Sequence, residues 1–167
     1  IPVFNGQASI EDVVARTMRA FQGESIQIVL VDDGSQDSSS KVCSALVLNH
    51  PDKVEFIELA RNFGEHSAVL AGLGQSKGEM VAILDDDGQN PPEELLKMFA
   101  ALVETKADVV YGKYAERKHH WFRILGSWFN DVVANVMLSK PKGLYLSSFK
   151  VMNRFLVDEI INHRGPF

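Results

Sequence analysis

Hydrophobic and polar positions along the chain follow two alternating patterns. Short runs rich in Val, Ile and Leu, which are typical of buried strands, alternate with longer stretches in which apolar residues recur at helical spacing. Strands that alternate with helices favour parallel pairing, so the pattern predicts an α/β domain with a mainly parallel central sheet. We expect strands at the start of the chain and at 27–32, 54–59, 80–84 and 108–111, and helices beginning at Ser9 and spanning 39–49, 65–75 and 91–105.

Polar side chains follow the ends of four successive predicted strands. They are Asn5 after the first, Asp32 and Asp33 after the second, Arg61 after the third and residues 85–87 after the fourth. The carboxyl ends of parallel strands meet at one edge of a sheet, where ligands of open α/β sheets bind. The sequence therefore predicts a common polar crevice at that edge.

Three adjacent carboxylates, Asp85, Asp86 and Asp87, follow the fourth strand. They repel one another unless a cation neutralises them. In an extended segment, alternation places Asp85, Asp87 and Gln89 on one side, and this all-oxygen set matches Mg²⁺ or Mn²⁺ rather than zinc. A solvated acidic turn that caps the following helix is the alternative interpretation.

Asp32 and Asp33 lead into a Gly-Ser turn and have two open interpretations. In the first they shape the turn, with Asp37 or Ser38 as the N-cap of the next helix. In the second, one of these strand-end carboxylates accepts the imide N–H of a uracil or the N–H groups of a guanine. Arg61, at the next strand end, is placed either to pair with these carboxylates or to reach a ligand phosphate.

Composition narrows the classes of function. The chain has 167 residues, of which 46% are apolar, and this is enough for the core of a single domain, 1–167. With 17 Lys+Arg against 22 Asp+Glu the formal charge is −5, which disfavours a nucleic-acid partner. The single cysteine, Cys43, excludes an internal disulfide and is expected to be a buried spacer. The chain contains no apolar run long enough for a membrane span and no export signal pattern.

The residues at the two ends of the sequence are typical of a chain that is part of a longer protein. Residues 1–3 resemble the last residues of a strand, and residues 164–167 come just after a predicted helix. We therefore expect the start of the first strand and C-terminal flanking segments to be missing.

Residues 121–138 carry apolar side chains at sustained i, i+3, i+4, i+7 spacing and predict an amphipathic helix. Both tryptophans lie on it and basic residues precede it, which suits an interfacial membrane helix, although a core helix has the same period. Arg117, Lys118 and Arg123 form a basic cluster near its start. Together with Lys150, these residues are candidates to bind an anionic ligand. A solvated basic loop is the alternative interpretation.

An ordered set of short motifs resembles the family-2 glycosyltransferases of GT-A fold, and among them the polyprenyl-phosphate glycosyltransferases of the dolichyl-phosphate mannose synthase-like branch. Each motif is weak alone, but the ordered set is specific and covers nearly the whole chain. The resemblance implies a three-layer α/β/α, Rossmann-like domain. The motifs are IPVFN at 1–5, VDDGS at 31–35, ARNFG at 60–64, LDDDGQNPPE at 84–93, DVVYG at 108–112 and SFKVM at 148–152.

The resemblance also implies roles for the site residues. The base of a nucleoside-diphosphate sugar would lie among Pro2, Phe4, Asn5, Asp32, Asp33 and Arg61, with Asp85 or Asp86 facing the nucleoside. The Mg²⁺ or Mn²⁺ that bridges the diphosphate would be held by Asp87 and Gln89, with Asp85 as a further candidate. The acceptor phosphate would contact Arg117, Lys118, Arg123, Ser148 and Lys150, and catalysis would depend on Asp86, Asp87, Arg117 and Arg123.

The chain departs from the family pattern at three places. Many relatives carry an acidic residue at the position of Gly6 and an Asp or His at that of Asn90. Near Ser147–Ser148, many relatives have an aspartate that is a candidate catalytic base. A hydroxyl acceptor needs a general base, whereas a polyprenyl phosphate is already an anion at neutral pH. The missing aspartate therefore favours a polyprenyl phosphate as the acceptor. The resemblance implies an inverting, metal-dependent transfer to it from a nucleotide sugar, with UDP favoured over GDP but both left open, at the cytoplasmic face of a membrane. Transfer to a polysaccharide or another hydroxyl acceptor is the alternative.

Two other classes share part of the pattern. In a haloacid-dehalogenase-type phosphatase, residues 85–88 would be the nucleophile motif, but Gln89 replaces the usual Thr or Val and the motif follows three earlier strands. In a receiver-type signalling domain, Asp32 and Asp33 would be the acidic pair, but the chain is too long for that fold. A dinucleotide-binding loop is disfavoured because residues 72–74 lack the third glycine.

Overall fold

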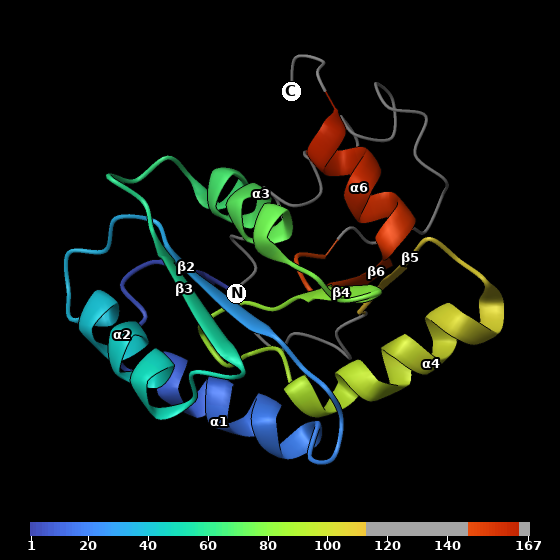
Figure 1. The fold of residues 1–167 in the computed structure, drawn as a ribbon, viewed down its shortest axis with the longest axis horizontal. Coiled ribbons are helices and arrows are strands. Elements are labelled where there is room, and N and C mark those ends of the chain that lie inside the picture. Colours follow the sequence, from blue (N-terminus) through green and yellow to red (C-terminus); the bar gives the residue numbers. More distant parts are fainter. Residues whose placement is uncertain (113–146, 164–167) are drawn as a thin grey trace, which may run out of the picture.

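The computed structural model describes residues 1–112 and 147–163, which form three layers (Figure 1). The strands lie in the middle layer. One face is covered by α1 (Ile10–Ala20), α2 (Ser39–Asn49) and α4 (Leu95–Thr105), and the other by α3 (Glu65–Gln75) and α6 (Arg154–Asn162). This arrangement confirms the predicted α/β/α domain.

The strands form two sheets of three. In the first, β1 (Pro2–Val3), β2 (Ile28–Asp32) and β3 (Val54–Glu58) pair in parallel in the order β1-β2-β3. In the second, β6 (Lys150–Asn153) lies between β4 (Met80–Ile83) and β5 (Val109–Tyr111) and is antiparallel to both. The parallel pairing that the sequence predicts is thus confirmed in the first sheet, whereas β6 brings antiparallel pairing into the second.

The predicted elements agree with the structure to within the usual uncertainty of element ends. The helix predicted at 39–49 matches α2, and the strand predicted at 80–84 ends at Ile83. The helix predicted from Pro91 begins as a short 3-10 turn, Pro92–Glu94, before α4. Proline suits this first turn because its missing N–H would have no partner there.

Helix α1 shows how the sequence produces one half of the core. Ile10, Val13 and Val14 are buried and lie on one side of the helix. Ile10 and Val14 pack in one cluster with Val3 of β1 and Leu30 of β2. This packing fixes the end of β1, and therefore the loop that follows it, against the sheet.

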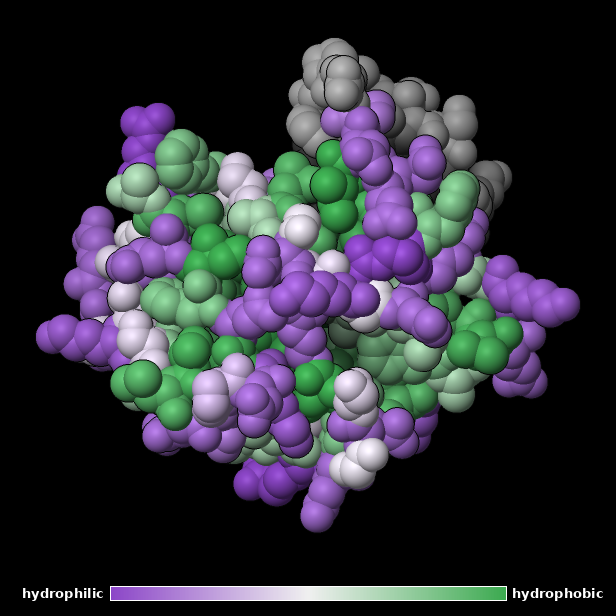
Figure 2. Space-filling model, viewed as in Figure 1, coloured by the Kyte–Doolittle hydropathy of each residue, from purple (hydrophilic) through white to green (hydrophobic). Residues whose placement is uncertain are grey.

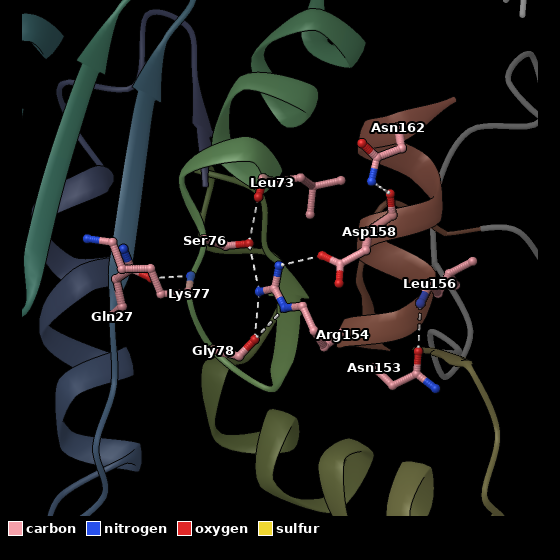
Figure 3. Close-up of polar contacts among 10 residues, drawn as sticks. All are labelled: Gln27, Leu73, Ser76, Lys77, Gly78, Asn153, Arg154, Leu156, Asp158 and Asn162. Atoms are coloured by element: carbon pink, nitrogen blue, oxygen red, sulfur yellow. Dashed lines mark hydrogen bonds and ion pairs between the residues drawn. The ribbon is translucent and has the colours of Figure 1, made fainter. Parts of the chain in front are cut away.

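Arg154 joins the start of α6 to the loop before β4 (Figure 3). Its Nε and Nη2 atoms donate to the carbonyl oxygen of Gly78 at 2.9 and 2.6 Å, and Nη2 also donates to Ser76 Oγ at 3.2 Å. Its Nη1 atom lies 3.3 Å from a carboxylate oxygen of Asp158, one turn along α6. The guanidinium group of Arg154 therefore holds the start of α6 against the loop before β4, through one backbone carbonyl and one side-chain hydroxyl.

Cys43 is fully buried in the cluster that contains Leu30, as predicted. Burial, followed by the charge of Asp32, raises the pKa of its thiol to about 12, so that no reactive thiolate forms at neutral pH. We expect an aromatic disulfide reagent to leave native Cys43 unmodified and to label it fully in concentrated guanidinium chloride. The reaction is measured by absorbance. Rapid labelling of the native protein would contradict the burial of Cys43.

The amphipathic helix predicted at 121–138 lies outside the described residues, and so do Arg117, Lys118 and Arg123. Their proposed roles therefore stay predictions. Within residues 1–112 and 147–163, no helix is long and apolar enough to cross a membrane.

Candidate functional site

The loops after β1, β2, β3 and β4 meet around a cavity of about 320 Å³ at the carboxyl ends of the parallel strands. The four strand ends thus meet in one crevice as predicted, but Asn5, Asp32 and Arg61, which were expected in it, are not among its lining residues. Pro2, Phe4, Asp33, Asp85, Asp86 and Asp87, all of them candidates from the sequence, line the cavity together with Val3, Asn62, Gly64 and Glu65.

Asp86 ties the loop after β4 to the end of β1. Its Oδ2 atom accepts a hydrogen bond from the backbone N–H of Phe4 at 3.0 Å. A Cβ atom on Gly6 would require the same carboxylate to shift. Burial, together with the carboxylates of Asp87 and Asp85, raises the pKa of Asp86 above its usual value although the Phe4 hydrogen bond opposes the shift. The surroundings of Asp86 therefore favour its neutral form more than water does.

Asp85 is held in place from two directions. Its Oδ2 atom accepts hydrogen bonds from Asn90 Nδ2 at 2.7 Å and from Ser148 Oγ at 2.6 Å. Asn90 is fully buried, and Ser148 lies just before β6. Ser148, predicted to contact an acceptor phosphate, thus contacts Asp85 in this structure and connects the second sheet to the site.

Asp87 and Gln89 are exposed, and Asp87 Oδ1 accepts a hydrogen bond from the N–H of Gln89 at 2.9 Å. The expected extended alternation of Asp85, Asp87 and Gln89 is wrong, because residues 86–87 form a turn and Gly88 has a φ of +71°. Among the described residues, no group of three or more His, Cys, Asp or Glu is arranged to hold a metal ion.

Asp32 shapes the Gly-Ser turn, as the first interpretation of the sequence expected, whereas Asp33 holds the loop after β3. Asp33 is buried and its two oxygens accept the N–H groups of Phe63 and Gly64, at 2.7 and 2.9 Å. Asp32 accepts from the backbone N–H of Ser35 at 3.2 Å and from its hydroxyl. Asp33 also lines the cavity and can therefore serve the second interpretation, whereas Asp32 does not belong to the lining.

Asn5 and Arg61 lie next to the cavity but are not part of its lining. The Asn5 side chain accepts a hydrogen bond from the N–H of Gln36 at 2.8 Å, which joins the loops after β1 and β2. The Arg61 guanidinium lies over the ring of Phe63, 4.8 Å from the ring centroid. Phe4 and Phe63 are 47% and 50% exposed, and of the two only Phe4 is among the lining residues of the cavity.

Lys150, at the start of β6, lies opposite Ile83, the last residue of β4. Its ammonium group lies 5.9 Å from the centroid of the Tyr111 ring. Of the basic residues predicted to contact the acceptor phosphate, Lys150 is the one within the described residues. It lies on the strand next to β4, which leads into the three aspartates.

Sequence reasoning missed Asn62, Gly64 and Glu65 as lining residues and Asn90 as the residue that orients Asp85. Asn62 and Gly64 follow the third strand end directly, so the rule that singled out Arg61 could have found them. The role of Asn90 depends on the path of the chain after Gly88, and the sequence contains no local signal for it.

Comparison with known proteins agrees with this geometry. The family model for glycosyl transferase family 2 matches residues 1–161. The chain is 35% identical over 163 residues to the undecaprenyl-phosphate 4-deoxy-4-formamido-L-arabinose transferase of Proteus mirabilis, covering 96% of the chain and 50% of that protein. It is 38% identical over 159 residues to the protein of the same name from Pseudomonas aeruginosa, covering 92% and 44%. The chain thus spans about half the length of the curated relatives it matches.

Solved structures show the same fold. A mannosyltransferase of Pyrobaculum calidifontis in complex with GDP-Man and Mn²⁺ gives a TM-score of 0.70 at 18% identity, over 95% of the chain and 44% of that protein. Glucosyl-3-phosphoglycerate synthase of Mycobacterium tuberculosis with Mn²⁺, UDP-glucose and phosphoglyceric acid gives 0.67 at 19% identity, over 93% and 55%. These likenesses confirm the predicted GT-A fold.

Proposed function

The chain belongs to glycosyl transferase family 2, and from that premise we propose that this domain transfers a sugar from a nucleoside diphosphate, UDP rather than GDP, to a polyprenyl phosphate. The observation that carries the proposal is the cavity at the carboxyl ends of the parallel strands, which gathers three consecutive aspartates with Phe4 and Asp33. No other described part of the sheet edge combines these groups.

The cavity has the groups that a nucleoside needs. The exposed ring of Phe4 offers a face on which a base can stack. Asp33 offers carboxylate oxygens, and each oxygen that accepts a backbone N–H retains a second lone pair for the N–H of a uracil. Solved proteins of the same fold hold GDP-Man or UDP-glucose, which supports a nucleotide-sugar donor in general.

A divalent cation, Mg²⁺ or Mn²⁺, fits the donor set of this site. Asp87 and Gln89 are exposed and offer two oxygen ligands, and the adjacent carboxylates of Asp85 and Asp86 line the same cavity as Asp87. Such ions are bound through one or two carboxylates, with phosphates and water completing the shell. When bound, the ion neutralises the charge that develops on the leaving diphosphate.

Lys150 supports an anionic acceptor, whereas the Ser148 hydroxyl donates its hydrogen bond to Asp85. Lys150 begins the strand next to β4. A lysine ammonium is a suitable partner for a phosphate group. The curated relatives are named for undecaprenyl phosphate, and we assign the same class of lipid acceptor here, with Arg117, Lys118 and Arg123 as further phosphate contacts. A lipid acceptor of this kind places the reaction at a membrane surface, which we assign to the cytoplasmic face.

The proposed reaction is one in-line displacement. A phosphate oxygen of the acceptor forms a bond to the anomeric carbon while the bond from that carbon to the diphosphate breaks, and the electron pair leaves on the nucleoside diphosphate. The configuration at the anomeric carbon is inverted. Because the acceptor is already an anion, no protein group has to remove a proton. The described residues therefore bind and orient the reactants, with Asp85 fixed by Asn90 and Ser148.

Calorimetry tests the donor site. UDP and GDP are titrated into the protein, each in Mn²⁺ and in EDTA. We expect UDP in Mn²⁺ to bind at least about tenfold more tightly than UDP in EDTA, because a cation links the diphosphate to the aspartates. Equal binding with and without metal would contradict the proposed role of the aspartates, and preference for GDP would change the donor.

The acceptor is tested by incubating the protein with radiolabelled UDP-sugars and either a polyprenyl phosphate or the matching polyprenol. We expect labelled lipid with the phosphate only, since the phosphate is already an anion whereas the alcohol has to lose its proton to a base as it attacks. Labelled product from the polyprenol or from a polysaccharide would favour a hydroxyl acceptor instead.

A further inference from the structure

The loop that carries the three aspartates is supported along one side by α1. Leu84 and Leu95, the residues just before and just after residues 85–94, are both buried in one cluster with Val13 of α1. A Cβ atom on Gly88 would lie 3.7 Å from a methyl carbon of the same valine, which is an ordinary van der Waals distance. Helix α1 thus holds both ends of the loop and lies close to the turn between them.

One charged residue of α1 is directed towards this loop. Hydrophilic residues border the lower edge of the molecule in Figure 2, the region in which Figure 1 shows α1. The other charged residues of α1 are exposed, whereas the Arg16 side chain is only 25% exposed. Arg16 follows Val13 by three residues, so both lie on the side of α1 that faces the loop.

The Arg16 guanidinium contacts the loop at two points. Its Nε and Nη2 atoms donate to the two carboxylate oxygens of Glu93, at 3.0 and 2.8 Å, and Nη1 donates to the carbonyl oxygen of Gly88 at 3.5 Å. The paired hydrogen bonds to Glu93 use the planar shape of a guanidinium group, which a lysine ammonium does not have. One side chain therefore links α1 to Gly88, directly after Asp87, and to the 3-10 turn that precedes α4.

The Gly88 contact lies at the centre of the proposed cation site. Gly88 stands between Asp87 and Gln89, the two exposed residues that we propose as cation ligands. A hydrogen bond from the N–H of Gln89 to Asp87 Oδ1 joins these two residues. The backbone around them is therefore held from two directions, by the end of β1 through Asp86 and by α1 through Gly88.

We propose that Arg16 is the positioning residue of the aspartate turn, residues 86–89, and that it holds Asp87 and Gln89 where one cation can reach both. An ion pair between partly exposed groups contributes little to the stability of a domain, so the main effect of the contact is the placement of the loop. The inference rests on the proposed function only in the use of Asp87 and Gln89 by a cation. The support of the turn by Arg16 does not depend on it.

Amide hydrogen exchange, measured without nucleotide or metal, tests the support of the turn. The variants are Arg16→Lys, which keeps the charge but loses the paired hydrogen bonds, and Glu93→Gln. We expect the N–H of Gln89 to exchange at least about fivefold faster in both variants, because the turn opens more often. Glu94→Gln is the matched control, because Glu94 pairs with Lys97 of α4 at 2.8 Å. It should leave the exchange rate of Gln89 at the wild-type value.

Calorimetry with UDP tests the consequence for the cation ligands. We expect Arg16→Lys and Glu93→Gln each to weaken UDP binding in Mn²⁺ by about tenfold, the usual effect of removing a group that orients metal ligands. UDP binding in EDTA should stay at the wild-type level, and Tm should change by less than about 3 °C. The double variant should lose no more affinity than the weaker-binding single variant, because both changes break the same contact. A merely structural role would instead lower Tm and weaken binding in EDTA as well.

An unchanged exchange rate of Gln89 in both variants would overturn the proposal, whether or not the protein binds UDP. So would faster exchange with unchanged UDP affinity in Mn²⁺, or an equal loss of affinity in Mn²⁺ and in EDTA. If the wild-type protein binds no UDP in Mn²⁺, the proposed function fails, whereas faster exchange in the two variants still supports the role of Arg16 in the turn.

Discussion

Asp87→Asn is expected to lower both metal-dependent UDP binding and sugar transfer by about 100-fold or more, the usual cost of removing one group that stabilises developing charge. The change removes the negative charge of an exposed carboxylate on the cavity. Because an asparagine oxygen can still accept the hydrogen bond from the N–H of Gln89, the turn at residues 86–88 should remain. Calorimetry in Mn²⁺ and in EDTA separates the loss of metal linkage from a loss of nucleotide contacts.

A matched control is Asp52→Asn, which removes the same charge from an exposed turn before β3, outside the cavity. This variant should keep wild-type UDP affinity, transfer rate and Tm. If Asp87→Asn binds UDP as the wild type does in Mn²⁺, or if Asp52→Asn loses as much affinity, the aspartate turn does not hold the cation. A comparable loss in EDTA for Asp87→Asn would indicate a direct role in nucleotide binding instead.

Elements whose pattern is local could be predicted from the sequence. The apolar run of β2 and the helical spacing of α1 are consequences of burial on a sheet and on one helix face, and both patterns are visible without tertiary information. The crevice was predictable for the same reason: once strands and helices alternate, the residues at the carboxyl ends of the strands have to meet at one edge.

Features that depend on distant partners could not be predicted in this way. The four residues of β6 form a strand because β4 and β5 lie on either side of them, and the run is too short to carry its own signal. The direction of the Asp85 side chain depends on Asn90 and Ser148, and the latter is 63 positions away in the chain. In the turn at residues 86–87, which replaces the expected alternation, Asp86 accepts a hydrogen bond from the N–H of Phe4, 82 positions away in the chain.

The loops around the cavity also depend on one close backbone contact, at Gly34. Gly34 has a φ of +70°, and a Cβ atom there would lie 2.6 Å from the carbonyl carbon of Arg61 and 2.6 Å from the nitrogen of Asn62. These are backbone atoms of the loop after β3, so they cannot move as a flexible side chain can. Asp33, next to Gly34, holds the same loop through the N–H groups of Phe63 and Gly64.

Gly34→Ala is therefore expected to destabilise the protein by about 3 kcal/mol, the sum of left-handed backbone strain and of overpacking. Gly23→Ala is the matched control, because Gly23 has a φ of +93° but nothing within 4 Å of an added Cβ. It should cost only the strain, about 1 kcal/mol. Urea denaturation measures both free energies of unfolding. Since the collision displaces Asn62, which lines the cavity, Gly34→Ala should also weaken UDP binding whereas Gly23→Ala should not. Equal destabilisation by the two variants would mean that the loops after β2 and β3 do not touch as the structure has them.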